Sequence, residues 1–398
     1  MTTVFSDMLY LLSCEINGKR AEKINTDITA ILDAASTQGV WMLVANAALS
    51  LDLDEEVKKQ IKMKFRASLT ASVTKIYSIY STVETLSKNG VSCCTLKGIS
   101  NSALYPNPDY RTSADVDLLI GEADKDKALE LLVKSGFYYD KAAIDHYEVV
   151  CRNAKNETIE LHTKLYDDLR CDVLFGGNSG ISEDFIEKTI PNYFKIKTLG
   201  VNDGAIYNFL HCVKHFLGSG VGIRQITDVL LYVHRFWDEM DREKFILALK
   251  RMKYSAFFNV CQYIGKKYLE ISPIDEIYTE NEKIIHTANK LLEDIENGGV
   301  FGRDKEERRN FYFKYMNRVL QEKQIKKKPT LLGKIKSFLK AAFVKKQVLY
   351  AKYPYLKKWP ILLPYAWLHR GIGYVLGRKD EKENCDIRMK LIEDLDMI

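Results

Sequence analysis

The sequence predicts an α+β fold, with a small mixed β-sheet core embedded in largely α-helical N- and C-terminal regions. Short apolar strand patterns cluster between residues 91 and 165, and longer stretches with helical spacing flank them on both sides. Glycine and proline are scarce, with 22 and 8 copies in 398 residues, which favours helix. The hydrophobic fraction of 46% and the charged fraction of 28% are typical of a globular protein, and the length suits about two or three domains.

Residues 1–90 are expected to form an N-terminal helical region. A long amphipathic helix is predicted because apolar side chains recur at helical spacing over several turns. A second helix is expected from Asp27 to Leu49, after a capping signal at residues 25–27. This region carries no recognisable chemistry, so we expect it to pack on the core as a helical cap. The apolar positions of the long helix are Ile61, Phe65, Leu69, Val73, Ile76, Tyr80 and Val83.

The middle of the chain, residues 91–200, is expected to form an α/β core. Its strand patterns are short and alternate with helix patterns, which predicts a small mixed sheet with helices on one side. Gly136 fits the C-cap of the longest helix. In chain order the predicted elements are a strand at residues 93–96, a turn at Lys97-Gly98, a short helix through 103–104, a strand at 115–120, a helix at 123–135 and a hairpin with strands at 146–152 and 157–162.

Carboxylates gather on two of the predicted strands. Because strand side chains alternate in direction, Asp115 and Asp117 point to the same side of one strand. Two carboxylates so close repel each other, and a divalent cation would relieve the repulsion, since Mg²⁺ prefers oxygen ligands. Glu160 and His162 share one face of a later strand, which supplies a third carboxylate. The alternative for the Asp-x-Asp pair is two acids on the wet face of an edge strand.

Cationic and small residues accompany the acids. Lys97 and Gly98 lie at a strand-to-helix turn, where free backbone amides and a cation suit a phosphate group. Ser100 follows in the same stretch, and Arg111 lies just before the acidic strand, within reach of a second phosphate. We therefore expect these four residues to bind phosphate.

This segment resembles the DNA polymerase β-like nucleotidyltransferase superfamily, in which a glycine turn after a strand precedes an Asp-x-Asp strand and a third acid on a further strand. The resemblance is specific over residues 95–162 and extends more loosely to residue 236. One position departs from the superfamily pattern, since Gly98 is followed by Ile99 and Ser100 and not directly by Gly or Ser. The fuller set of motifs is similar to that of a bacterial family described as uncharacterised nucleotidyltransferases: LKG, LYP, R-x-x-x-DVDLLI, the Gly136-Phe137 pair and ELH.

The resemblance implies a magnesium-dependent transfer of a nucleoside monophosphate from a nucleoside triphosphate to an acceptor hydroxyl, with release of pyrophosphate. Asp115, Asp117 and Glu160 would hold two Mg²⁺ ions, with Mn²⁺ as the alternative ion, and His162 would orient these ligands. The four phosphate-binding candidates would hold the triphosphate. The base of the donor stays open, and the acceptor would be a small molecule, a sugar, a lipid-linked molecule or a protein.

Two other functions stay open from the sequence. The same fold and site would also suit transfer of a phosphate group from the triphosphate, as in a kinase. Alternatively, the chain would be a non-catalytic module that binds a nucleotide or a membrane surface. The three intact acids argue against this last alternative.

Residues 201–320 are expected to form a helical domain that completes the active-site cleft. His211 and His215 lie one helical turn apart, as do Arg224 and Asp228. The histidine pair lacks the acid of an HExxH motif, which excludes a metalloprotease of that type. These groups are either satisfied core polar residues or, as the resemblance favours, a wall opposite the carboxylates. In the second case His215, Arg224 and Asp228 would hold base, ribose or acceptor.

The tail, residues 321–398, differs in composition from the rest of the chain. Between residues 321 and 360, twelve lysines face a single acid, Glu322, and apolar residues recur among them at helical spacing. The segment 326–368 is either a helix packed on the protein with its lysines in solvent, or an interfacial segment that contacts a membrane surface. Nucleic-acid binding is the weakest alternative, because the formal net charge of the chain is +6.

The chain is expected to be cytoplasmic, with a peripheral position at the inner membrane face if the tail binds there. It has no apolar stretch of transmembrane length, and its first ten residues carry an acid and no basic region, unlike a secretory signal. Its eight cysteines form no Cys-x-x-Cys pair and mostly lie in apolar runs, as buried thiols do in a reducing compartment.

Overall fold

The structure is a computed structural model, and it describes residues 1–113, 115–140, 148–155, 157–165, 185–189, 195–218, 220–298, 353–375 and 379–397. The chain divides into two compact units, one of residues 1–303 with 394–397 and the other of residues 304–393 with 398. The first unit holds a small mixed sheet among helices, so the predicted α+β fold is confirmed. The predicted division into four regions stays a prediction.

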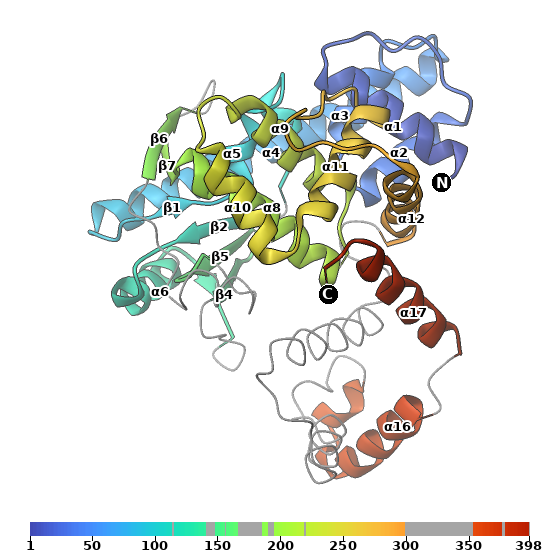
Figure 1. The fold of residues 1–398 in the computed structure, drawn as a ribbon. Coiled ribbons are helices and arrows are strands. Elements are labelled where there is room, and N and C mark those ends of the chain that lie inside the picture. The colour runs from blue at the N-terminus through green and yellow to red at the C-terminus, as the bar shows by residue number, and fades with distance from the viewer. Residues whose placement is uncertain are drawn as a thin grey trace. The chain divides into compact units, whose positions relative to one another are not determined.

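The first unit contains a five-stranded sheet (Figure 1). Its strands are β1 (Cys94–Thr95), β2 (Val116–Leu119), β3 (Phe137–Tyr138), β4 (Glu148–Asn153) and β5 (Thr158–His162). Their order across the sheet is β1-β2-β5-β4-β3. β2 and β5 run parallel and the other neighbours run antiparallel, so the predicted hairpin is confirmed as β4 and β5.

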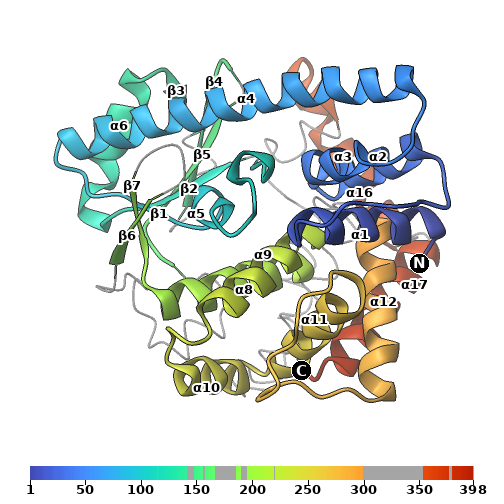
Figure 2. The same ribbon diagram turned by 90° about the horizontal axis from the view of Figure 1, so that it is seen from above.

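One face of this sheet is apolar and packs against two helices. Val116 and Leu118 of β2 are buried in one cluster with Ile159 and Leu161 of β5 and with residues of α4 and α6. α4 (Glu55–Lys88) is a single helix of 34 residues, which confirms the predicted long amphipathic helix. Figure 2 shows α4 running along the sheet toward α6 (Lys125–Lys134).

Three shorter helices precede α4: α1 (Thr3–Ile16), α2 (Ile28–Thr37) and α3 (Trp41–Ala48). The predicted capping signal is confirmed, because the Asp27 carboxylate accepts a hydrogen bond of 3.0 Å from the backbone N–H of Ala30. The prediction of one continuous helix from Asp27 to Leu49 is wrong. Gly39 adopts a φ of +68°, in the left-handed region, and separates α2 from α3.

A second group of helices covers the other side of the sheet. α8 (Val201–Leu217) and α9 (Ile223–Phe236) lie on the side opposite α4 in Figure 2. Twelve of the 17 residues of α8 are buried, so this helix lies inside the unit. The remaining elements of this part are the antiparallel strands β6 (Phe185–Thr189) and β7 (Lys195–Leu199) and the helices α10 (Arg242–Met252), α11 (Ser255–Tyr268) and α12 (Glu282–Gly298).

The second unit is described in its C-terminal part. It contains α16 (Leu363–Val375) and most of α17 (Lys379–Asp394), with a small apolar cluster of Tyr353, Leu356 and Ala366. The predicted basic helix between residues 321 and 352 lies outside the described residues. None of the described helices combines the length and the apolar character that a transmembrane span requires.

Candidate active site

The two central strands bring acidic side chains together on one face of the sheet. β2 and β5 are parallel, and Asp117 is the register partner of Glu160. Paired residues of neighbouring strands point to the same face, so the two carboxylates lie side by side. His162 follows two residues after Glu160 and therefore shares that face. The alternate residues of both strands point to the apolar cluster on the other side.

The three side chains are close enough to share one cation. One ligand atom from each of Asp117, Glu160 and His162 lies within 4.8 Å of the others. His162 Nε2 is 3.0 Å from Asp117 Oδ1 and 3.8 Å from Glu160 Oε2. Asp117 is 2% exposed, so solvent screens its charge poorly. A buried and a half-buried carboxylate together with an imidazole make a donor set that fits a divalent cation.

Burial and neighbouring charges set the protonation of the two acids. Burial raises the pKa of the Asp117 carboxyl, but Lys97 and His162 outweigh burial and hold that pKa below its ordinary value. Burial, followed by the charge of Asp117, raises the pKa of the Glu160 carboxyl to about 8. Ionisation of Glu160 beside the charged Asp117 is therefore unfavourable, and a bound divalent cation would offset that cost.

Lys97 links this cluster to α8. Its Nζ lies 3.1 Å from Asp117 Oδ1 and 2.7 Å from Nε2 of the His211 ring. Burial, followed by the charge of Lys97, lowers the pKa of His211 well below its ordinary value, so the ring is neutral and accepts the hydrogen bond. Lys97 is a predicted phosphate contact, and in this structure its ammonium group neutralises Asp117.

The turn before α5 (Ile99–Ser102) closely approaches the segment that leads into β2. Gly98 has a φ of +60°, and a methyl group on it would lie 3.4 Å from Ser113 Oγ, so the turn favours glycine. The Ser113 hydroxyl donates to the Asp115 carbonyl at 2.8 Å and lies 3.3 Å from Asp115 Oδ1. Asp115 is not one of the three clustered ligands, but it lines the adjoining pocket together with Lys97.

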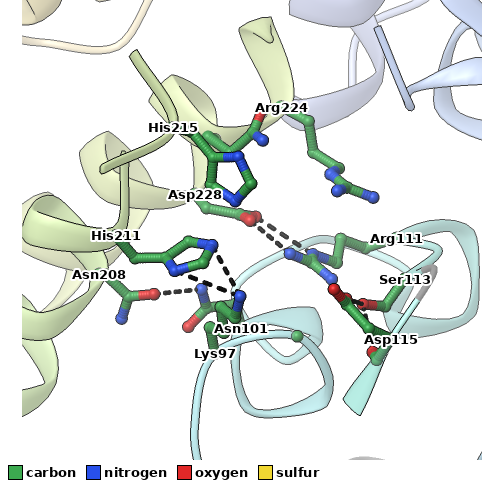
Figure 3. Close-up of a pocket in the computed structure, with 12 residues that line it drawn as sticks. Lys97, Asn101, Arg111, Ser113, Asp115, Asn208, His211, His215, Arg224 and Asp228 are labelled. Carbon is green, nitrogen blue, oxygen red and sulfur yellow. Dashed lines mark hydrogen bonds and ion pairs between the residues drawn. The ribbon is translucent and has the colours of Figure 1, made fainter. Parts of the chain in front are cut away.

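This pocket lies between the Gly98 turn, the segment before β2 and helices α8 and α9 (Figure 3). It brings together predicted residues that are far apart in the sequence, namely Lys97, Gly98, Arg111, Asp115, His215, Arg224 and Asp228. Residues that were not among the predicted site residues complete the lining, namely Asn101, Ser113, Asn208, His211 and Gln225. The predicted wall from α8 and α9 and the predicted phosphate-binding turn therefore line the same pocket.

Arg111 and Asp228 form a buried ion pair at this pocket. Nε of Arg111 donates to Asp228 Oδ1 at 3.2 Å, and Nη2 pairs with Oδ2. The Tyr105 hydroxyl donates to the same Asp228 Oδ1 at 2.8 Å. Asp228 therefore holds both Arg111 and Tyr105, while Nη1 of Arg111 has no hydrogen-bond partner in the described part of the chain.

The helix α5 contributes one predicted and one unpredicted polar residue. Ser100 is buried, and its hydroxyl donates to the Lys97 carbonyl at 3.1 Å, so it supports the turn without lining the described pocket. Asn101 does line the pocket, and its Nδ2 donates to Asn208 Oδ1 at 2.6 Å. Its own Oδ1 has no hydrogen-bond partner within the described ranges. No motif marks either asparagine. Their meeting depends on how α5 packs on α8, which a local pattern does not encode.

The fold and the site together define an α+β protein with a buried acidic cluster beside a pocket rich in cationic groups. A family model described as uncharacterised nucleotidyltransferase matches residues 25–269, more than half of the chain, and the chain belongs to this family. The matched region contains the sheet, the acidic cluster and the whole pocket lining. No curated protein matches the chain.

Proposed function

We propose that this protein is a Mg²⁺-dependent nucleotidyltransferase that moves a nucleoside monophosphate from a nucleoside triphosphate to an acceptor hydroxyl and releases pyrophosphate. The observation that carries the proposal is the pairing of the buried Asp117 with the half-buried Glu160 on adjacent strands, beside a pocket rich in cationic groups. Membership of a nucleotidyltransferase family supports the same class of reaction. Such transfer needs charge neutralisation and positioning more than covalent help from the protein.

The acids fit a magnesium site. Asp117 and Glu160 offer carboxylate oxygens, and a bound cation would offset the burial and the Asp117 charge that raise the pKa of Glu160. Asp115, Asp117 and Glu160 would hold two Mg²⁺ ions, and Mn²⁺ would accept the same oxygen ligands. When bound, the ions would neutralise the phosphates and lower the pKa of the acceptor hydroxyl.

Two side chains of the acidic cluster would orient a carboxylate and accept a proton. His162 lies within hydrogen-bond distance of Asp117 Oδ1 and would fix the orientation of that carboxylate. Glu160 lies next to Asp117 in the parallel register and would take up the proton of the acceptor hydroxyl. Lys97 would continue to supply positive charge close to the reacting phosphate, since it lines the pocket.

The pocket would hold the substrates. Gly98 and Arg111 line it and would contact the triphosphate, with Ser100 supporting the turn. The α8 and α9 wall would hold base, ribose or acceptor through His215, Arg224 and Asp228. The donor is a nucleoside triphosphate of open base, and the acceptor is a small molecule, a sugar, a lipid-linked molecule or a protein.

The position of a radiolabel distinguishes nucleotidyl transfer from phosphate transfer. With Mg²⁺, a triphosphate labelled at the α-phosphate should pass its label to an acceptor from a mixture of these classes, and pyrophosphate should be released. The γ-label should appear in the pyrophosphate. Transfer of the γ-label with release of a nucleoside diphosphate would contradict the proposal and favour the phosphotransferase alternative. An Asp117→Asn preparation serves as the blank.

As a second function, we propose that residues 326–368 of the tail make a peripheral contact with an anionic membrane surface at the cytoplasmic face. Apolar side chains of this segment are exposed, with Trp359 at 56% and Ile361 at 83%, close in sequence to the twelve lysines. The full chain should float with phosphatidylserine vesicles, and Ile361→Glu should reduce flotation. Ile387→Glu, an equally drastic change at an exposed isoleucine outside the segment, is the matched control. Equal flotation of all three chains, or equal binding to neutral vesicles, would remove the proposal.

A further inference from the structure

The pocket contains two guanidinium groups whose hydrogen bonds are incomplete. Arg111 lines it from the segment before β2 and Arg224 lines it from α9, and Figure 3 shows both side chains beside the pocket. Nη1 of Arg111 and Nε of Arg224 are shielded from solvent, and neither has a hydrogen-bond partner among the residues that the structure describes. Leaving the donor of a charged group buried and unpaired is unfavourable, so these two atoms mark where an acceptor from a ligand would bind.

The charge around these two groups also favours an anion. Asp228 pairs with Arg111, so its carboxylate is already engaged. Among the described residues Arg224 forms no ion pair, and its Nη1 donates to the neutral Thr112 carbonyl at 2.8 Å. Burial, followed by the charge of Arg111, lowers the pKa of Arg224, but a guanidinium stays charged at neutral pH. Asp115 and Asp228 act on it from a distance.

The guanidinium of Arg224 rests on the turn between α2 and α3. A methyl group on Gly39 would lie 3.4 Å from Cζ and from Nη1 of Arg224, and 3.5 Å from Nε. The near-equal distances place Gly39 against the flat face of the guanidinium. The N–H groups lie in the plane of that group and therefore point away from Gly39. A side chain longer than a methyl group at this position would push against Arg224.

The same turn holds the start of α9. Gln38 is buried, and its Oε1 accepts a hydrogen bond of 3.0 Å from the backbone N–H of Ile223. Its Nε2 donates to the Ile295 carbonyl at 2.8 Å. Ile223 is the neighbour of Arg224, so residues 38 and 39 fix both the backbone next to Arg224 and its side chain.

We propose that Arg111 and Arg224 form a phosphate-binding subsite and that Gln38 and Gly39 are its positioning residues. A phosphate offers several acceptor oxygens and matches the planar fork of a guanidinium, so it suits a pocket that both guanidinium groups line. The subsite rests on the proposed function for its substrate, since the phosphate would belong to the donor triphosphate or to a phosphorylated acceptor. The N-terminal helices thereby become part of the active site.

A pair of glycine variants tests the subsite with a matched control. Gly39 follows α2 and Gly18 follows α1, both in the left-handed conformation, with φ of +68° and +63°. Asparagine tolerates this conformation better than most residues. A Cβ atom added at Gly18 would meet no described atom within 4 Å, whereas one added at Gly39 would meet Arg224. Gly18→Asn therefore imposes the same unfavourable backbone conformation on asparagine as Gly39→Asn does, but without a contact to Arg224.

The measurement is calorimetric binding of inorganic tripolyphosphate to the full chain in EDTA. Gly39→Asn and Arg224→Gln should each weaken binding about ten- to a hundredfold, because a charge-assisted contact is lost. Gly18→Asn should bind as the wild type does. The double variant should bind no more weakly than Arg224→Gln alone, because both changes remove the same contact. Circular dichroism shows whether each variant folds. If Gly39→Asn does not fold, the comparison of Arg224→Gln with the wild type tests the subsite.

Wild-type affinity in Gly39→Asn and Arg224→Gln, equal weakening by Gly18→Asn, or no tripolyphosphate binding by the wild type would overturn the subsite. Because no transfer is measured, a chain that binds tripolyphosphate as expected but transfers no nucleotide would contradict the proposed function alone. Competition with a nucleoside triphosphate identifies the source of the phosphate. If the nucleoside triphosphate displaces tripolyphosphate, the subsite binds the phosphates of the donor. If the two bind at the same time, the subsite binds a phosphorylated acceptor.

Discussion

At the scale of residues, two histidines of α8 stand close to the cationic groups and stay neutral. Their rings are 4.4 Å apart, and both line the pocket. Burial, followed by the charge of Lys97, lowers the pKa of His215 to about 3 and that of His211 well below its ordinary value. At neutral pH the permanent positive charge of the pocket lining therefore comes from Lys97, Arg111 and Arg224.

The neutral state of His215 predicts a loss of stability in mild acid. Its pKa is about 3 in the folded chain and roughly 6.5 when unfolded. Because the folded value is lower, this contribution to stability is complete above roughly pH 6.5 and falls as the pH drops toward 3, by up to about 1.4 kcal/mol per unit. Urea unfolding at several pH values should give a shallower pH dependence for His215→Gln than for the wild type. The exposed His286, changed to Gln, is the control, and equal slopes in His215→Gln and the wild type would contradict the prediction.

Local sequence patterns predict directions of side chains but not their partners. Alternation along a strand placed Glu160 and His162 on one face, and the register agrees with that. The same alternation gave no sign that His162 would contact Asp117, or that Lys97 would reach His211 on α8. Those contacts depend on which strands and helices become neighbours, and short motifs hold no information about that.

At the scale of elements, the parallel pairing of β2 with β5 builds the acidic cluster. Asp117 and Glu160 meet because their strands are in register, and a slip of one residue would turn every side chain of one strand to the opposite face. The buried residues on the other face resist such a slip. Val116 and Ile159, register partners themselves, are both buried in the cluster beneath α4 and α6.

Removing packing beneath the sheet should cost stability. Ile159 is 0% exposed, so Ile159→Ala should lower the free energy of unfolding by about 2–4 kcal/mol through lost burial and a residual cavity. Val133, exposed at 51% on α6, offers the control Val133→Ala, which should change stability by less than about 0.5 kcal/mol. Urea unfolding measures both. A loss in Ile159→Ala as small as that of the control would mean that this face does not secure the strand pair.

Elements with a strong pattern could be predicted from the sequence, and elements that depend on distant partners could not. α4 keeps its apolar spacing over many turns, and the β4–β5 hairpin joins neighbouring segments, so both were predicted. β3 has only two residues and is a strand because it pairs with β4, so it was not predicted. β1 also has two residues, but it lies within the strand predicted at residues 93–96. The break at Gly39 was missed because a single glycine is tolerated within many helical patterns.

At the scale of the whole first unit, the site joins segments that the sequence treats as separate regions. Lys97 contacts His211 across 114 residues of chain, and Arg111 contacts Asp228 across 117. The turn at Gly39 adds a third segment, from helices that showed no chemistry of their own. Most residues of the pocket lining are therefore among the predicted site residues, while their arrangement around one pocket required the folded chain.

Calorimetric binding of ATP, CTP, GTP and UTP, with and without Mg²⁺, tests the central claim most directly. The wild type should bind at least one triphosphate in a Mg²⁺-dependent manner, and Asp117→Asn should lose that binding because the carboxylate pair is broken. Asp126→Asn makes the same chemical change at an exposed position on α6 and should bind as the wild type does. Absence of triphosphate binding by the wild type, or Mg²⁺-dependent binding that persists in Asp117→Asn, would show that these acids do not form the nucleotide site.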